Sequence, residues 1–265
     1  MHPFGELVIA VIPARFGATR FPGKPLADIA GVPMVVRVAR QAAAATTIQE
    51  VLIATDDPRI ARVVEQAGFA VAMTPPECAT GSDRIAWAIR ERRGPAPRLV
   101  VNVQGDEPLL DPRDLDALVK ATLADPGAIG TLARPLPDPS RFADPNLVKV
   151  ARAAGGRALY FSRSPIPYGA EAPLLHVGIY AYPPEVLSRF VALPPSPLER
   201  TERLEQLRAL ENGIPIQVTM CVSERPSLGV DTPEDVARVI EELRHRNQLG
   251  TSHAAAPNGH AHHEP

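Results

Sequence analysis

The sequence predicts an α/β fold in which helices flank an open, mostly parallel sheet. Three short apolar runs lack the alternation of a half-exposed strand: residues 7–12, 51–54 and 99–103. Such runs are typical of strands buried on both faces. Helix-like stretches alternate with them: residues 32–44, 58–67 and 82–93. The last two are followed by glycines, Gly68 and Gly94, which are common helix stops.

This strand and helix order also predicts where a ligand binds. Parallel strands joined by right-handed crossover helices bind their ligands beyond the carboxyl ends of the strands. We therefore expect the functional residues within 14–24, 55–56 and 104–108.

After about residue 127 the pattern loosens into short strands rich in proline. We expect strands at 147–151, 158–161 and 175–182, and a helix over 198–212. Residues 127–214 are interpreted as an inserted antiparallel strand and helix region, within a single domain of residues 1–250. A strand at 216–221 and a helix opened by Asp231-Thr232-Pro233 complete the domain. Residues 251–265 are rich in Ala, Pro, Gly and His and are expected to be a disordered tail.

Composition narrows the function. The formal net charge of -2 provides no overall field for holding a polyanion, so a nucleic acid is not the expected partner. No apolar run reaches about 18 residues and no signal peptide precedes the first strand, which predicts a cytoplasmic protein with no membrane contact. The two cysteines, Cys78 and Cys221, offer neither a disulfide framework nor a paired-cysteine metal site.

The segment from Arg15 to Pro25 predicts a phosphate-binding loop. Arg15, Arg20 and Lys24 supply cations, and glycines between them let the backbone approach an anion closely. A charged surface loop is the plain alternative. A Walker loop does not fit, because the spacing from Gly17 to Lys24 is one residue too long and a proline follows the lysine. No dinucleotide-binding glycine pattern follows the first strand either.

Two carboxylates are candidate ligands of Mg²⁺. Asp106 follows a buried strand, and Asp231 precedes the last helix. Magnesium that bridges phosphates needs one or two protein carboxylates, with its other oxygens coming from substrate and water. Taken singly, Asp106 could be a turn residue and Asp231 a helix cap. If the sheet order brings both together, they would face one triphosphate.

Together these segments resemble the 3-deoxy-manno-octulosonate (Kdo) cytidylyltransferases, or CMP-Kdo synthetases, within the nucleotidyltransferase superfamily. The resemblance covers roughly residues 7–245. It rests on blocks at residues 12–15, 19–26, 54–56, 81–84, 102–108, 158–163, 176–180, 204–207 and 229–235. It implies a nucleotide-diphospho-sugar transferase-like fold, a homodimer, and transfer of CMP from CTP to the anomeric hydroxyl of Kdo for lipopolysaccharide biosynthesis.

The resemblance also implies roles for individual residues. Catalysis would fall to Lys24, Arg15 and Asp106, and Mg²⁺ to Asp106 and Asp231. Nucleotide binding would use Arg15, Arg20, Lys24, Arg84 and Gln104. The sugar would be bound by Gln104, Arg163, His176, Tyr180, Glu205 and Gln206. Arginine can clamp the Kdo carboxylate, while the other side chains can bind its hydroxyl groups.

Some features depart from the family pattern or leave an alternative open. Ala18 stands where the family often has serine, and residues 75–78 form an unusual version of their loop, so base contacts there are not predicted. His176 and Tyr180 could be core residues on one face of a strand. On a continuous helix over 198–212, Arg203 would fall within the leucine arc, where it would either lie along apolar surface or reach an acidic partner.

Rival functions remain at this point. Another CMP-sugar acid synthetase, acting on an amino variant of Kdo or on a sialic acid, would use the same machinery. A catalytically silent nucleotide-binding homologue is a rival from a different class.

Overall fold

The computed structural model describes residues 7–17, 21–224 and 228–253, with side chains as far as Arg246. Its main sheet runs in the order β11-β7-β10-β6-β1-β4-β5, with β8 and β9 attached beside β10. The strands are β1 (Val8–Ala14), β4 (Glu50–Thr55), β5 (Ala70–Met73), β6 (Leu99–Asn102), β7 (Ile129–Pro135), β8 (Lys149–Arg152), β9 (Ala158–Ser162), β10 (Leu174–Tyr182) and β11 (Ile216–Met220).

The sheet is mostly parallel, as predicted. β1 lies between β4 and β6 and pairs with both in parallel. β10 is antiparallel to β6 and to β7, whereas β11 is parallel to β7. A separate hairpin of β2 (Asp28–Ile29) and β3 (Val32–Pro33) follows the phosphate-binding segment.

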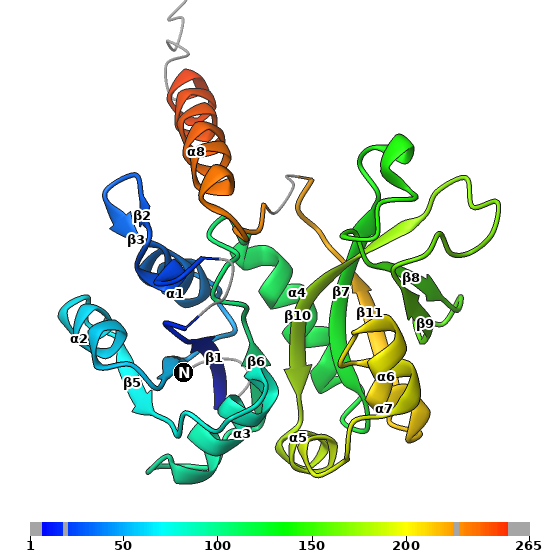
Figure 1. Ribbon diagram of the computed structural model, residues 1–265, viewed down its shortest axis with the longest axis horizontal. Coiled ribbons are helices and arrows are strands. Elements are labelled where there is room, and N and C mark those ends of the chain that lie inside the picture. Colours follow the sequence, from blue (N-terminus) through cyan, green and yellow to red (C-terminus); the bar gives the residue numbers. More distant parts are fainter. Residues whose placement is uncertain (1–6, 18–20, 225–227, 254–265) are drawn as a thin grey trace, which may run out of the picture.

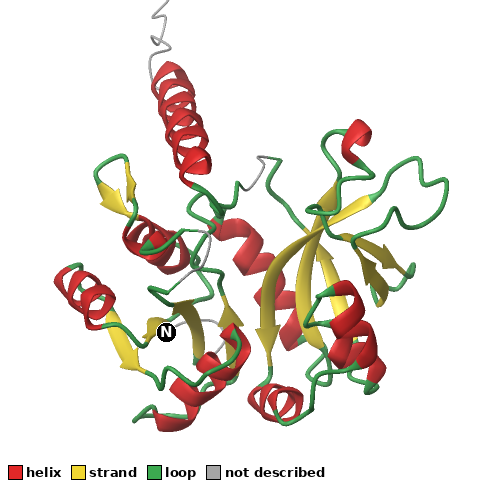
Figure 2. Cartoon of the chain, in the orientation of Figure 1, coloured by secondary structure: helices red, strands yellow, loops and turns green. Residues whose placement is uncertain are grey.

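Helices cover both faces of the sheet (Figures 1 and 2). They are α1 (Met34–Ala43), α2 (Pro58–Gln66), α3 (Gly81–Glu91), α4 (Pro112–Leu123), α5 (Pro184–Val191), α6 (Pro197–Glu202), α7 (Leu207–Glu211) and α8 (Pro233–His253). None of these described helices combines the length and the apolar character that crossing a membrane requires.

Alternation along β1 creates two cores. Val8, Ala10 and Ile12 pack with α1, α2 and α4, whereas Ile9 and Val11 pack with α3, α5 and α7 on the opposite face. Every one of these five side chains is almost fully buried, as a central parallel strand requires. The continuous apolar run seen in the sequence is thereby explained.

A third, smaller core lies under α8. Ile29, Met34, Leu109, Val230 and Val239 form it, so it joins the hairpin, the start of α1 and the last helix. Figure 1 shows α8 projecting away from the sheet beyond this contact.

The prediction of one continuous helix over residues 198–212 was wrong. The structure divides it into α6 and α7, because Arg203 takes a left-handed conformation with φ 56° and ends α6. Leu204, Leu207 and Leu210 keep a helical spacing after the break, so the periodicity of apolar residues did not reveal it. Arg203 is exposed at a helix end rather than in the middle of an apolar stripe.

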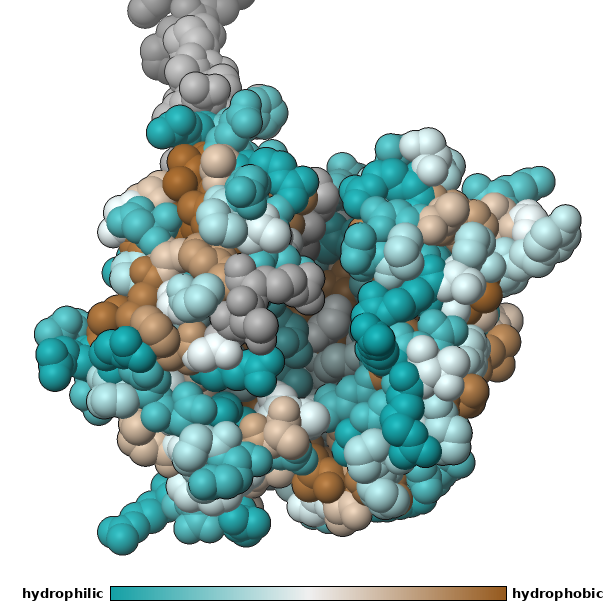
Figure 3. Space-filling model, viewed as in Figure 1, coloured by the Kyte–Doolittle hydropathy of each residue, from teal (hydrophilic) through white to brown (hydrophobic). Residues whose placement is uncertain are grey.

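The two sides of the sheet separate above β6. Only residues 180–182 of β10 pair with β6, while residues 174–177 pair with β7 and not with β6. Figure 3 shows the surface hollowed between the two halves of the molecule. This hollow lies at the edge of the sheet where the sequence predicted the ligand site.

Candidate active site

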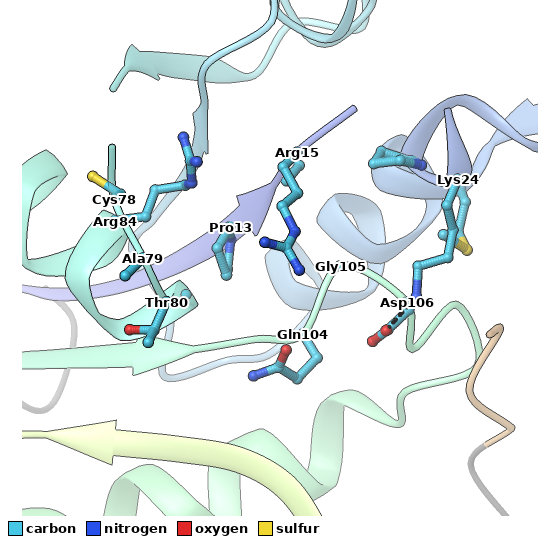
Figure 4. Close-up of a pocket in the computed structure, with 14 residues that line it drawn as sticks. Pro13, Arg15, Lys24, Cys78, Ala79, Thr80, Arg84, Gln104, Gly105 and Asp106 are labelled. Atoms are coloured by element: carbon cyan, nitrogen blue, oxygen red, sulfur yellow. Dashed lines mark hydrogen bonds and ion pairs between the residues drawn. The ribbon is translucent and has the colours of Figure 1, made fainter. Parts of the chain in front are cut away.

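A pocket of about 250 Å³ lies at the carboxyl ends of β1 and β6 (Figure 4). It is lined by Pro13, Ala14, Arg15, Lys24, Pro25, Met34, Cys78, Ala79, Thr80, Gly81, Arg84, Gln104, Gly105 and Asp106. The pocket thus combines residues of the predicted phosphate-binding segment with the strand-end carboxylate and the start of α3.

The phosphate-binding segment folds back on itself around Phe16. The Gly23 N–H donates to the Phe16 carbonyl oxygen at 2.9 Å. Gly23 has φ 73°, and a Cβ there would lie 3.1 Å from the Phe16 ring. On α2, Arg59 places its guanidinium carbon 3.3 Å from the centre of that ring and pairs with Asp57 at 2.6 Å. These contacts fix Phe16 and Gly23, which are the neighbours of Arg15 and Lys24, the two cations of this segment that line the pocket.

Lys24 brings the two predicted metal ligands together. Its ammonium donates to Asp106 Oδ2 at 2.7 Å and to the Val230 carbonyl oxygen at 2.9 Å, and it lies 3.5 Å from Asp231 Oδ1. The Asp106 side chain is 33% exposed and that of Asp231 is 65% exposed, so both carboxylates stay accessible. Segments from the two ends of the chain therefore meet at one cation.

The donor set suits a magnesium ion. Two hard carboxylates already hold a cationic group between them, and no group of three or more His, Cys, Asp or Glu side chains in the described part of the chain forms a ready-made metal site. Magnesium bound to a nucleotide needs only one or two carboxylates from the protein.

Asp231 is not occupied in capping the last helix. The Asp235 carboxylate accepts the backbone N–H groups of Asp231 and Thr232, both at 2.9 Å. Asp235, in the first turn of α8, thus supplies the reciprocal bond of a capping box, and the Asp231 side chain lies beside Lys24.

Arg84 is a buried side chain that lines the pocket. It lies in α3, pairs with Asp56 at 2.8 Å, and contacts Thr74. Thr80 and Asp83 form a capping box at the start of the same helix. The capping contacts orient the first turn of α3 toward the pocket, where free N–H groups favour an anion.

The predicted sugar-binding residues are divided by the structure. Gln104 lines the pocket and lies 3.4 Å from Asn102 Oδ1. Arg163, His176, Tyr180, Glu205 and Gln206 do not line it; they come from β10 and from the segments that follow β9 and α6. Arg20 lies outside the described residues.

His176 and Tyr180 belong to a row of aromatic side chains on β10. Their ring centres are 5.5 Å apart, and Phe161 contacts His176 edge-on at 4.9 Å. His176 Nε2 lies 3.0 Å from the Thr131 hydroxyl. Burial lowers the pKa of His176 to about 3 and raises that of Tyr180, so both side chains are neutral at pH 7.

Glu205 and Gln206 lie between α6 and α7. The Ser82 hydroxyl donates to Glu205 Oε2 at 2.8 Å. Burial raises the pKa of Glu205, while the Ser82 hydrogen bond and the Arg208 charge oppose the shift. Gln206 is 7% exposed.

Arg163 is held by backbone oxygens. Its guanidinium donates to the carbonyl groups of Glu202 and Pro145 at 2.9 Å and of Arg203 at 3.4 Å. It lines a separate surface depression with Asn146 and Thr201. In this geometry the guanidinium fixes a loop and does not reach the pocket.

Sequence reasoning missed several residues that build the site. Ser82, Thr80, Arg59 and Asp235 position other side chains and were not among the candidates. The spacing of Thr80 and Asp83 is a capping-box signal that could have located the first turn of α3. The contacts of Ser82 and Arg59 cross between distant segments, so no local pattern indicates them.

Comparison with known proteins identifies the relatives of this chain. A family model described as cytidylyltransferase matches residues 9–218. The 3-deoxy-manno-octulosonate cytidylyltransferase of Syntrophotalea carbinolica is 48% identical over 89% of this chain and 98% of its own length. The enzyme of the same name from Anaeromyxobacter dehalogenans is 49% identical over 87% of this chain and 95% of its own length.

Solved structures agree. The structure of CMP:2-keto-3-deoxy-manno-octonic acid synthetase complexed with CTP has a TM-score of 0.84 and 38% identity, covering 91% of this chain and 99% of that one. A nucleotidyl transferase from Methanothermobacter thermautotroptrophicus, with a TM-score of 0.61 and 14% identity over 92% of this chain and all of that one, shares the fold. With its pocket, its carboxylates and these relatives, the chain belongs to the 3-deoxy-manno-octulosonate cytidylyltransferase family.

Proposed function

We propose that the protein transfers CMP from CTP to the anomeric hydroxyl of Kdo, giving CMP-Kdo and pyrophosphate. The observation that carries this proposal is the meeting of Arg15, Lys24, Asp106 and Asp231 at one edge of the sheet, in a chain of this family. The alternatives of a silent homologue or of another sugar acid have no specific observation in their favour.

The chain's own residues would act mainly by positioning and by charge. Arg15 and Lys24 carry the positive charge at the pocket that a triphosphate requires, and the first turn of α3 adds backbone N–H groups. Holding CTP and the sugar acid in line replaces a slow bimolecular encounter. Fixed cations also stabilise the charge that develops on the phosphate oxygens as pyrophosphate leaves.

Asp106 and Asp231 would hold Mg²⁺. Their carboxylates lie on the same side of the pocket as Lys24, whose ammonium they already share. When bound, the ion would neutralise phosphate charge and lower the pKa of the attacking hydroxyl. No separate general base is therefore assigned.

The sugar acid would lie between the pocket and the row of aromatic side chains on β10. Gln104 faces it from the pocket, and His176, Tyr180, Glu205, Gln206 and Arg163 are proposed as its further contacts. The neutral imidazole of His176 can both donate and accept hydrogen bonds, which suits a polyol. The homodimer, the cytoplasmic location and the part in lipopolysaccharide biosynthesis are further proposals, supported by the family resemblance.

One assay tests the proposal. The purified chain should release pyrophosphate from CTP and Mg²⁺ only when Kdo is added, and should form CMP-Kdo in equal amount. Competition among Kdo, its amino variant and a sialic acid identifies the preferred substrate. If no pyrophosphate appears with any of the three, the chain is a silent homologue.

A further inference from the structure

Ser82 connects the nucleotide pocket to a side chain outside it. It is the second residue of α3 and is 1% exposed. The two residues before it, Thr80 and Gly81, line the pocket. Its own hydroxyl points elsewhere and donates to Glu205 Oε2 at 2.8 Å. One helical turn thus contacts both the pocket and the segment between α6 and α7.

The Glu205 carboxylate accepts one close hydrogen bond, and the nearby Thr80 hydroxyl also lowers its pKa. Oε2 accepts from Ser82, whereas Oε1 is buried and accepts no hydrogen bond from any residue that the structure describes. The nearest cation is Arg208, whose Nη2 lies 3.7 Å from Oε1. Buried carboxylate oxygens are rarely left without a donor, so Oε1 is suited to a donor supplied by a ligand.

Ser82 is itself held rigidly. The capping box between Thr80 and Asp83 fixes the turn that carries it. Ser82 and Asn102 also lie beside the buried Tyr182 hydroxyl, where both partly offset the rise in its pKa that burial causes. Asn102 Oδ1 in turn lies 3.4 Å from Gln104 Nε2, which lines the pocket. A polar network therefore runs from the pocket through Ser82 to Glu205.

We propose that Ser82 is a positioning residue, which holds the Glu205 carboxylate so that Oε1 can accept a hydroxyl group of the sugar acid. The proposal rests on the proposed function, because it assigns a task to Ser82 within the same reaction. Only a small side chain that carries a hydroxyl can fill this buried position and donate to Glu205.

The surroundings of Glu205 make the assignment measurable through pH. Burial and the nearby Asp83 raise its pKa, while the hydroxyl groups of Ser82 and Thr80 and the charge of Arg208 lower it. Tyr180 and Tyr182 also face it and stay neutral, because burial raises their pKa values. Removing the Ser82 hydroxyl takes away a group that favours the ionised form, so the Glu205 pKa should rise further.

The test is steady-state kinetics on the full chain carrying Ser82→Ala. We expect the KM for Kdo to rise about tenfold, the size typical of losing one hydrogen bond to a charged group. The KM for CTP should change by less than about twofold on the same reasoning, since Ser82 does not line the pocket. The acid limb of kcat/KM for Kdo should move to higher pH. Ser82→Thr, which keeps the hydroxyl, should restore the KM for Kdo and the position of the acid limb.

Ser188→Ala is the matched control, because Ser188 is exposed on α5 and donates only within its own helix. If Ser82→Ala does not fold, Ser82→Cys, of similar size but with a weak donor, should show the same effects at smaller size. Equal rises in both KM values, an unmoved acid limb or no rescue by threonine would overturn the assignment. If the wild-type chain itself forms no CMP-Kdo, the proposed function is overturned instead.

Discussion

Lys24 assembles the site at the scale of single residues. It contacts Asp106 and Val230 by hydrogen bonds and lies within ion-pair distance of Asp231. Two like charges beside each other repel, and the ammonium offsets that repulsion. The lysine is therefore needed to bring the carboxylates together, in addition to its proposed contact with phosphate.

Asp106→Asn should leave a folded protein that forms CMP-Kdo at least on the order of 100-fold more slowly, the effect typical of losing a charge-stabilising group. The side chain is partly exposed, so folding does not depend on its charge. Pyrophosphate release at saturating Mg²⁺ is the measurement. Asp138→Asn, in an exposed turn, is the control. Near-normal turnover would exclude Asp106 as a metal ligand.

Gly23→Ala should lower the free energy of unfolding by about 1–2 kcal/mol, the cost of a side chain in the left-handed region. Its φ is 73° and the new methyl group would press on Phe16. Gly17→Ala is the control in the same segment, because nothing lies within 4 Å of its added Cβ. Urea denaturation compares the two, and equal losses would contradict the explanation.

Individual residues were predictable where their chemistry is local. Arg15, Gln104 and Asp106 follow strands closely, Lys24 belongs to the glycine-containing segment after β1, and the structure places all four at one pocket. Asp231 was ambiguous in the sequence, because a carboxylate before a helix is usually a cap. Only the geometry shows that the Asp231 side chain lies beside Lys24, while Asp235 accepts the backbone N–H groups of Asp231 and Thr232.

At the scale of elements, α8 supports the site indirectly. Val239 on this helix packs in the small core with Val230, the residue before Asp231. Lys24 also donates to the carbonyl oxygen of Val230. The position of a carboxylate in the site thus depends on apolar packing outside it.

Val239→Ala should destabilise the protein by about 2 kcal/mol, from lost burial and the cavity left behind. It should also raise the Mg²⁺ concentration that gives half-maximal turnover, since Asp231 is held less firmly. Glu241→Ala, on the exposed side of the same helix, is the control. A stability loss with an unchanged Mg²⁺ requirement would show that α8 does not position Asp231.

The elements differ in how far the sequence reveals them. β1, β4 and β6 are buried on both faces, and their unbroken apolar runs identified them. β5 lies at the sheet edge with partly exposed side chains, so no such run marks it. The break between α6 and α7 begins at the left-handed backbone of Arg203, and side-chain spacing does not report backbone conformation.

At the scale of the whole molecule, the fold class followed from strand and helix alternation, because parallel sheets have few possible arrangements. The antiparallel character of the inserted region was predicted, but the pairing of β10 between β6 and β7 was not. This pairing determines the divergence from β6, and with it the position of His176 and Tyr180 relative to the pocket. The candidate sugar-binding residues therefore rest on family resemblance and not on reasoning from the chain itself.

Stability of the whole molecule should fall as the pH is lowered below about 6.5, and His176 should contribute to this fall. Burial lowers its pKa to about 3. Between these values the unfolded chain binds a proton that the folded chain does not, so acid favours unfolding. The effect should reach about 1 kcal/mol one pH unit below 6.5.

Urea denaturation at pH 7 and pH 5.5 measures this effect. His176→Gln should show a smaller fall between the two pH values than the wild type. His245→Gln, at an exposed position, should show the same fall as the wild type. Equal pH dependence in all three would mean that the His176 ring titrates freely in the folded protein.

The contact of Lys24 with Asp106 and Val230 has a consequence for protein synthesis. Lys24 and Val230 lie 206 positions apart in the chain. Domains fold as the ribosome extends the polypeptide. The strands that surround β1 can pair long before residue 231 is made. A nascent chain would then hold a largely formed sheet whose carboxylate pair is still incomplete. Activity should therefore arise abruptly, near the end of translation.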